Sequence, residues 1–166
     1  MGWQADAGVL QYIRRRVDEF KTHLQATYPS DPRTEALVAK LRDVRLLEPK
    51  TKSETSYNSG VFSHTTGTLG VAPRDGRGVV RPESSLNKTI VHELAHATRF
   101  KHPGESSHSK EWKSSFVWFL GVATEELGWE IELPCSVETF YGLGRKDCPM
   151  CEWSNQACDR FTGPPK

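Results

Sequence analysis

The sequence lacks long hydrophobic runs and a recognisable export signal. No stretch of about 18 apolar residues occurs, so a membrane-spanning helix is not expected. The first residues do not combine a basic segment with a following apolar segment, which is the pattern of a secretory signal. We therefore expect an intracellular protein, in the cytoplasm, the nucleoid or the nucleus, with no membrane partner.

Net charge is nearly absent as well. The 22 basic and 21 acidic residues leave a formal charge of +1. This balance gives no general attraction to nucleic acid or anionic lipid, so DNA binding would need a local basic patch. The run Arg14-Arg15-Arg16 is interpreted as the solvated face of a helix, and a patch that contacts phosphate is the alternative.

Cysteines are few, and all four lie after residue 134. A chain of 166 residues can bury a core without disulfides. Cys148 and Cys151 have the spacing of a zinc knuckle, and a reducing compartment favours zinc over disulfides. A structural zinc on all four cysteines is therefore predicted, with two disulfides or free thiols as alternatives: Cys135, Cys148, Cys151 and Cys158.

The most informative motif is His92-Glu93-Leu94-Ala95-His96, inside a helix predicted over residues 86–101. Residues four apart lie on the same face of a helix, so both imidazoles can bind one Zn²⁺. Glu93 stands beside the first ligand, where its carboxylate can take a proton from a metal-bound water. A Lewis acid and a general base are the minimum for metal-assisted hydrolysis of an amide. The motif is short, and two unrelated histidines on an exposed helix are the alternative.

The residues around this motif fit a buried helix. Its immediate neighbours are uncharged, which suits a metal site that excludes water. Ser84 or Ser85 is the expected cap, and Pro103-Gly104 the expected end. An apolar stripe at helical spacing consists of Leu86, Ile90, Leu94 and Ala97.

A catalytic zinc needs a third protein ligand. His102 has the spacing of the metzincin pattern, but Arg99 stands where that pattern needs glycine, and a continuing helix would turn His102 away from the site. His108 is preferred, because it directly precedes a helix predicted over residues 110–127 that can present it to the first helix. The remaining candidates are glutamates of that second helix: Glu111, Glu125 and Glu126.

Together these segments resemble the SprT/Spartan family of zinc metallopeptidases. The resemblance rests on Thr89-Ile-Val-His-Glu-Leu-Ala-His-Ala and on His108-Ser-Lys-Glu-Trp-Lys, and it covers residues 86–116. It implies a zincin domain in which His92, His96 and His108 bind zinc and Glu93 is the catalytic base. It also implies protein substrates, including proteins crosslinked to DNA. DNA as a partner is implied by the resemblance alone.

The rest of the chain predicts an α+β fold. One N-terminal helix is expected with Asp6 as its cap, and another begins at Asp31-Pro32 and extends to Val44. Residues 56–81 hold strand formers between glycines, which favours a small, twisted, mostly antiparallel sheet with a tight turn at Arg74-Asp75-Gly76. The first helix has an apolar face of Val9, Ile13, Val17, Phe20 and Leu24, and the helix over residues 110–127 has one of Trp112, Phe116, Phe119, Ala123 and Leu127.

The resulting hypothesis is a monomeric α+β zincin domain over residues 1–133 with a cysteine-bearing extension over residues 134–166. Its expected function is hydrolysis of peptide bonds in a protein or peptide substrate, with one catalytic Zn²⁺. Tyr57 and Tyr141 are candidates for stabilising an oxyanion, and His64 is interpreted as an ordinary sheet histidine. The alternatives are a non-catalytic zincin that binds protein or DNA, and a self-cleaving regulatory peptidase.

Overall fold

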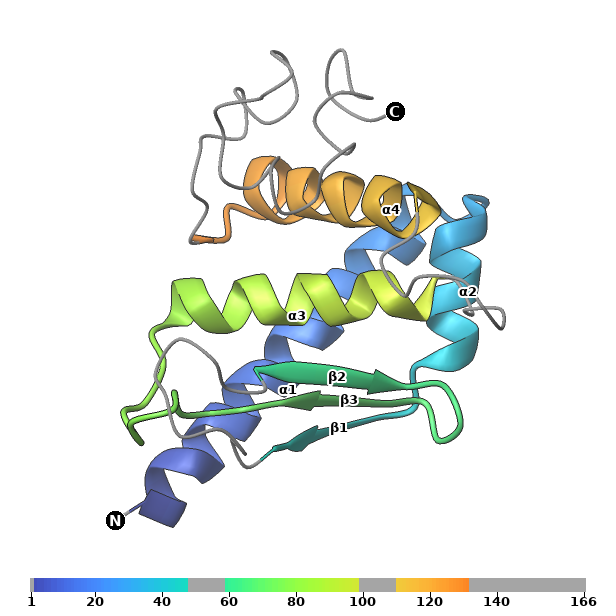
Figure 1. Cartoon of the computed structure of the whole chain (residues 1–166). Helices are drawn as coiled ribbons and strands as arrows, with labels where there is room; N and C mark the ends of the chain where they lie inside the picture. Colours follow the sequence, from blue (N-terminus) through green and yellow to red (C-terminus); the bar gives the residue numbers. More distant parts are fainter. Residues whose placement is uncertain (1, 48–58, 99–109, 132–166) are drawn as a thin grey trace.

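The computed structural model describes residues 2–47, 59–98 and 110–131. A three-stranded sheet forms one layer, helix α3 (Glu83–Ala97) runs along it, and helix α4 (Lys110–Gly121) packs on the other side of α3 (Figure 1). Helix α1 (Gly2–Thr27) contacts both α3 and the sheet. The middle layer of the described structure is therefore the helix that carries the histidine motif.

Helix α1 buries the face predicted from its spacing, because Ile13, Val17, Phe20 and Leu24 all lie in the core. The predicted cap was wrong, since the helix begins at Gly2 and not after Asp6. The carboxylate of Asp6 instead accepts a hydrogen bond from Arg74 Nε at 3.1 Å. This contact ties α1 to the turn that follows the sheet.

The arginine run lies on α1 in the way that the solvated-face interpretation predicts. Arg14 and Arg15 are exposed. Arg16 is half-buried, where it donates to the Tyr12 hydroxyl at 3.0 Å and to Glu19 at 2.9 Å. The third arginine thus makes contacts within α1 and also lies over the ring of Trp129, 5.1 Å from its centroid.

Helix α2 (Pro32–Lys40) begins as predicted, with Asp31 as its cap and proline at its first position. Its predicted end was wrong, because Val44 lies in strand β1 (Asp43–Leu46) and not in the helix. The N–H groups of Arg42 and Asp43 both donate to the Gly67 carbonyl, at 2.8 and 3.2 Å, and this bonding draws the chain into the sheet. The spacing of Leu41 and Val44 fits one helical turn, but pairing of β1 with β3 overrides this local preference.

The sheet has the order β1-β3-β2 and is mixed. Strand β2 (Gly60–Ser63) pairs antiparallel with β3 (Thr68–Val71), inside the region predicted to hold strands. Strand β1 pairs parallel with β3, so the prediction of a mostly antiparallel sheet was wrong for one of the two pairings. The likeness of this architecture to a zincin stays a prediction.

The turn after β3 forms where the sequence predicted it. The carboxylate of Asp75 accepts the N–H groups of Arg77 at 2.9 Å and of Val79 at 3.0 Å. These backbone bonds, that of Val79 first, lower the pKa of Asp75. The residue with left-handed backbone is Gly78, with φ 85°, so the glycine that this turn requires is not Gly76.

Helix α3 starts earlier than predicted, with Pro82 before its first residue and no side-chain cap, so that Ser84 and Ser85 lie inside it. Thr98 ends it within the described residues. Helix α4 continues into a π-helical turn, η1 (Val122–Glu126), and together they occupy the predicted second helix.

The core is rich in aromatic rings contributed by α1, α4 and the segment after η1. Phe20 of α1 makes an edge contact with Phe119 at 4.9 Å between ring centroids, and Trp129 lies 5.6 Å from Phe20. These buried aromatic contacts hold α4 and the segment after η1 against α1.

Within the described residues, no helix combines the length and the hydrophobicity needed to cross a membrane.

Candidate metal centre

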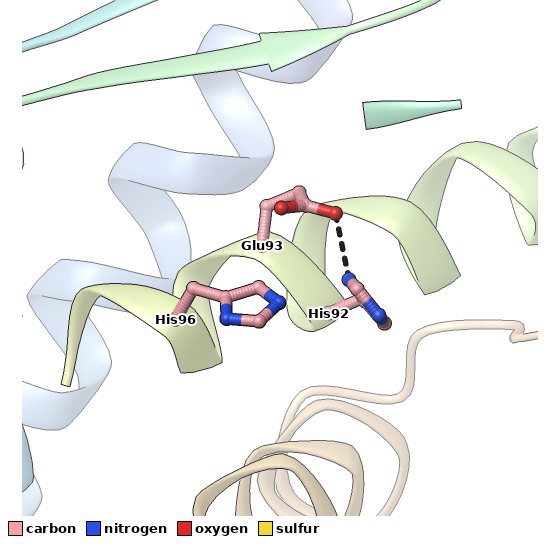
Figure 2. A group of neighbouring side chains, drawn as sticks. All are labelled: His92, Glu93 and His96. Carbon is pink, nitrogen blue, oxygen red and sulfur yellow. Dashed lines mark hydrogen bonds and ion pairs between the residues drawn. The ribbon is translucent and has the colours of Figure 1, made fainter. Parts of the chain in front are cut away.

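His92 and His96 extend from adjacent turns of α3, as the four-residue spacing predicts (Figure 2). Their ring centroids are 5.1 Å apart, and both side chains are half-buried. One ligand atom from each of His92, Glu93 and His96 can be chosen so that all three lie within 4.8 Å of one another. In the described part of the chain, these are the residues that could hold a metal ion as a group of three.

Glu93 contacts His92 directly. Its carboxylate oxygen Oε2 lies 2.6 Å from His92 Nδ1, and its side chain is only 7% exposed. Because an ionised carboxylate can only accept, Nδ1 carries the hydrogen of this bond. In the neutral imidazole, Nε2 then holds the lone pair that a metal would bind.

Aromatic rings of α4 form a wall beside both histidines. Trp112 stacks on His96 at 5.0 Å with 24° between the ring planes, and its edge contact with His92 is at 4.9 Å. Phe116 lies 5.5 Å from His92. These contacts restrict rotation of both imidazoles, so the direction of each ring is set by packing between α3 and α4.

Strand β2 approaches α3 closely at the same level. A Cβ atom on Gly60 would lie 2.5 Å from Thr89 Cγ2 and 3.0 Å from Glu93 Cγ. Only glycine therefore permits this approach, which brings β2 against the side chain of Glu93. Sequence analysis noted only that glycines separate the strand formers of residues 56–81, because the close approach at Gly60 depends on a tertiary contact that no local pattern encodes.

Arg81 is a buried cation that sequence analysis missed. It is 5% exposed and lies between the end of the turn and the start of α3. Its guanidinium donates to the carbonyl oxygens of Ser59, Ala72 and Ser85 and to the hydroxyl groups of Ser85 and Thr89. Arg81 therefore joins the backbone beside β2 and β3 to the first turns of α3. No sequence signal distinguishes it from the exposed arginines.

None of the three glutamates proposed as third ligands belongs to the group around His92. Glu126 accepts the Tyr28 hydroxyl at 2.7 Å and bonds His23 Nε2 at 2.8 Å, far along the chain from the motif. The bond to Glu126 raises the pKa of Tyr28 to about 12. Glu111 and Glu125 are exposed, and neither belongs to the group around His92.

His64 lies in the turn between β2 and β3, with its ring 5.1 Å from that of Phe62. Burial lowers its pKa, and the charge of Lys40 adds to this effect. It is not part of the histidine group, but it lies in the turn and not in a strand, so its interpretation as a sheet residue was wrong in position. The other predicted site residues lie outside the described residues: Tyr57, His102, His108, Cys135, Tyr141, Cys148, Cys151 and Cys158.

Comparison with known proteins decides the family. Residues 3–162 match the family model described as Phycodnaviridae minor capsid protein P4. The chain belongs to this family. A relative named minor capsid protein P4, from Paramecium bursaria Chlorella virus 1, is 53% identical over 150 residues, which is 89% of this chain and 82% of the relative. No solved structure matches.

This membership overturns the resemblance to SprT/Spartan metallopeptidases. The resemblance rested on residues 86–116, whereas the P4 match covers almost the whole chain. The predictions of a zinc endopeptidase, of a hydrolase with Glu93 as general base and of a role in DNA–protein crosslink repair were therefore wrong. Neither the non-catalytic zincin nor the self-cleaving peptidase is supported. Whether the histidines bind a metal is a separate question, because a metal can be held without hydrolysis.

Proposed function

We propose that this chain is a minor structural component of a viral capsid, which acts by binding other capsid proteins. The observation that carries the proposal is the 53% identity to a minor capsid protein over 89% of this chain. Identity of this extent over most of both chains makes a common role in the particle the direct interpretation.

The structure suits a role in binding. Helices and sheet pack around a buried core, and a folded surface loses less conformational entropy on association than a disordered segment does. Among the described residues, the large hydrophobic side chains that remain exposed are Val61 on β2 and Val79 and Val80 in the turn before α3. An exposed apolar side chain of this kind gains free energy when a partner covers it.

The test uses purified particles of the virus that encodes the chain. After a high-salt wash and mild protease treatment, mass spectrometry should detect the chain at a constant ratio to the principal capsid protein. Chemical crosslinking of intact particles should join it to other capsid proteins. A chain that is abundant in infected cells and absent from washed particles would contradict the proposal.

A further inference from the structure

We propose that His92 and His96 bind a divalent transition-metal ion, of the Zn²⁺ class, and that Glu93 positions His92 for it. The inference goes beyond the capsid role and does not depend on it. It requires no chemical reaction, because the ion would join two adjacent turns of α3 and leave the chain intact.

The spacing of the candidate ligand atoms fits such an ion. Two nitrogens bound tetrahedrally to zinc at about 2.05 Å lie about 3.3 Å apart. The chosen atoms of His92, Glu93 and His96 all lie within 4.8 Å of one another. The ion would draw the two imidazole nitrogens to the shorter distance by rotation of the rings.

The contact between Glu93 and His92 is the second observation that indicates a metal. Histidines that bind metals commonly donate their other ring N–H to a carboxylate, which fixes the tautomer and makes the ligand nitrogen more basic. Here the 2.6 Å contact of Glu93 with His92 Nδ1 leaves Nε2 as the ligand atom. Glu93 is thus a positioning residue, and its carboxylate does not bind the ion.

Burial and charge favour the same conclusion. Glu93 is 5% exposed, and a buried carboxylate is stable only when it is paired. A cation on the far side of the His92 ring would polarise the ring and strengthen its bond to Glu93. Two neutral imidazoles select zinc, copper, nickel or cobalt over magnesium and calcium, which prefer oxygen ligands.

Aromatic side chains of α4 pack against both histidines. Trp112 and Phe116 hold the imidazoles from one side, so the entropy of ordering them is lost on folding and not on binding. Water fills the coordination positions that protein side chains leave open.

The experiment is a titration of the full chain with Co²⁺ and Zn²⁺ after removal of metal with a chelator. Competition with a chromogenic chelator should show that His92→Ala and His96→Ala each lower zinc affinity by about 100-fold, since each removes one ligand of the pair. His64→Ala and His23→Ala are matched controls and should bind like the wild type, because neither residue belongs to the group.

The four cysteines need separate control, because they could bind zinc themselves. Thiolate ligands give Co²⁺ an intense charge-transfer band in the near ultraviolet that imidazole ligands do not. The Cys151→Ser variant should therefore keep the visible spectrum of the histidine site. Unchanged Co²⁺ spectra and zinc affinity in both His92→Ala and His96→Ala would overturn the proposal.

The positioning role of Glu93 has its own readout. Glu93→Gln should lower zinc affinity by about 10- to 100-fold. Nitrogen-15 NMR of the metal-free wild type should show the hydrogen of His92 on Nδ1, and Glu93→Gln should shift the tautomer toward Nε2–H. An unchanged tautomer and unchanged affinity would leave Glu93 with a purely structural role and refute this part of the proposal.

Wild-type protein provides a test that does not depend on folding of the variants. Zn²⁺ should protect His92 and His96, but not His64, from modification by diethyl pyrocarbonate, measured by peptide mass spectrometry. Equal modification with and without zinc would overturn the site. Neither outcome bears on incorporation into particles, so failure of this inference is distinguishable from failure of the capsid proposal.

Discussion

At the scale of single residues, the structure separates what spacing can predict from what it cannot. The pairing of His92 and His96 followed from helical geometry, and the structure confirms that they lie close together. The partner of Glu93 could not be predicted, because a carboxylate beside a histidine can point to solvent, to a metal-bound water or to the ring. The direction of Glu93 depends on the approach of β2, and that of the His92 ring depends on Trp112 and Phe116 of α4, which are tertiary contacts.

Gly60 tests how closely β2 must approach the histidine helix. In Gly60→Ala the new methyl group would lie 2.5 Å from Thr89 Cγ2, so the strand or the helix must shift. We expect a loss of about 1–3 kcal/mol in the free energy of unfolding, as for other overpacked positions. Urea unfolding followed by circular dichroism measures it. Gly8→Ala is the control, because a Cβ there meets nothing within 4 Å, and it should be neutral or stabilising.

His108 stays a prediction as the third ligand of the proposed ion. It lies outside the described residues, four positions before Trp112, whose ring stacks on His96. His108→Ala should lower zinc affinity by at least about 10-fold, and His102→Ala should leave it near the wild-type value. Chelator competition ranks the two variants, and the reverse order would assign the role to His102.

At the scale of helices and strands, the sequence predicted the positions of all four described α-helices, and most errors lay at their ends. Apolar periodicity located α1, α3 and α4 because each helix buries one continuous face. Strand β1 was missed, since Val44 also fits the helical spacing that continues α2. What decides between the two is pairing with β3, more than twenty residues later in the chain, and no window of local sequence contains that partner.

The cap of α2 gives a prediction at this scale. The Asp31 carboxylate accepts the Arg33 N–H at 2.8 Å and pairs with the Arg33 guanidinium at 2.9 Å. Asp31→Ala should destabilise the protein by about 1 kcal/mol, and Asp31→Asn by less, because asparagine keeps the cap. Thermal unfolding measures both, and the exposed Ser30→Ala is the control.

The stabilisation by the Asp31 carboxylate should depend on pH. The side-chain bond from Arg33 is the main reason that the pKa of Asp31 lies below its ordinary value of 3.8. A group with a lowered pKa in the folded state stabilises the protein above its unfolded pKa, and the stabilisation disappears as pH falls through the folded pKa. The difference in unfolding temperature between wild type and Asp31→Asn should therefore be constant near neutral pH and shrink below pH 3.8. A difference that grows at low pH would contradict the assignment.

At the scale of the whole molecule, a short motif proved a poor guide to family. The chemistry of two histidines and a glutamate is local, and it recurs wherever helical spacing allows. The family match, in contrast, extends over residues 3–162, which is almost the whole chain. The buried aromatic core of the chain is likewise built from several elements and not from one motif. Residues outside 86–116 were compatible with the zincin hypothesis because an apolar face on a helix is common to many folds.

Zinc also gives a prediction for the stability of the whole domain. A ligand that binds only the folded state at 100 times its dissociation constant adds about 2.7 kcal/mol to the free energy of unfolding. The unfolding temperature of the wild type should therefore rise with zinc, and that of the His92→Ala, His96→Ala double variant should rise less. Calorimetry at equal protein concentration measures the difference. Equal shifts would place any stabilising ion elsewhere, at the cysteines for example.

The exposed Val79 is a candidate contact of this chain with other capsid proteins. Val79 is 55% exposed, and it contributes only its backbone N–H to the bond with the Asp75 carboxylate, so a change of its side chain should leave the turn folded. A charged side chain at this position would have to lose water when a capsid protein covers it, and burying an unpaired charge costs several kcal/mol. Val79→Lys should therefore reduce binding to the capsid protein identified by crosslinking by at least about 10-fold, measured with purified proteins. Thr22→Lys, on the exposed face of α1, adds the same charge and should bind normally. Equal binding by both variants would exclude this turn from the interface and direct the search to other faces of the molecule.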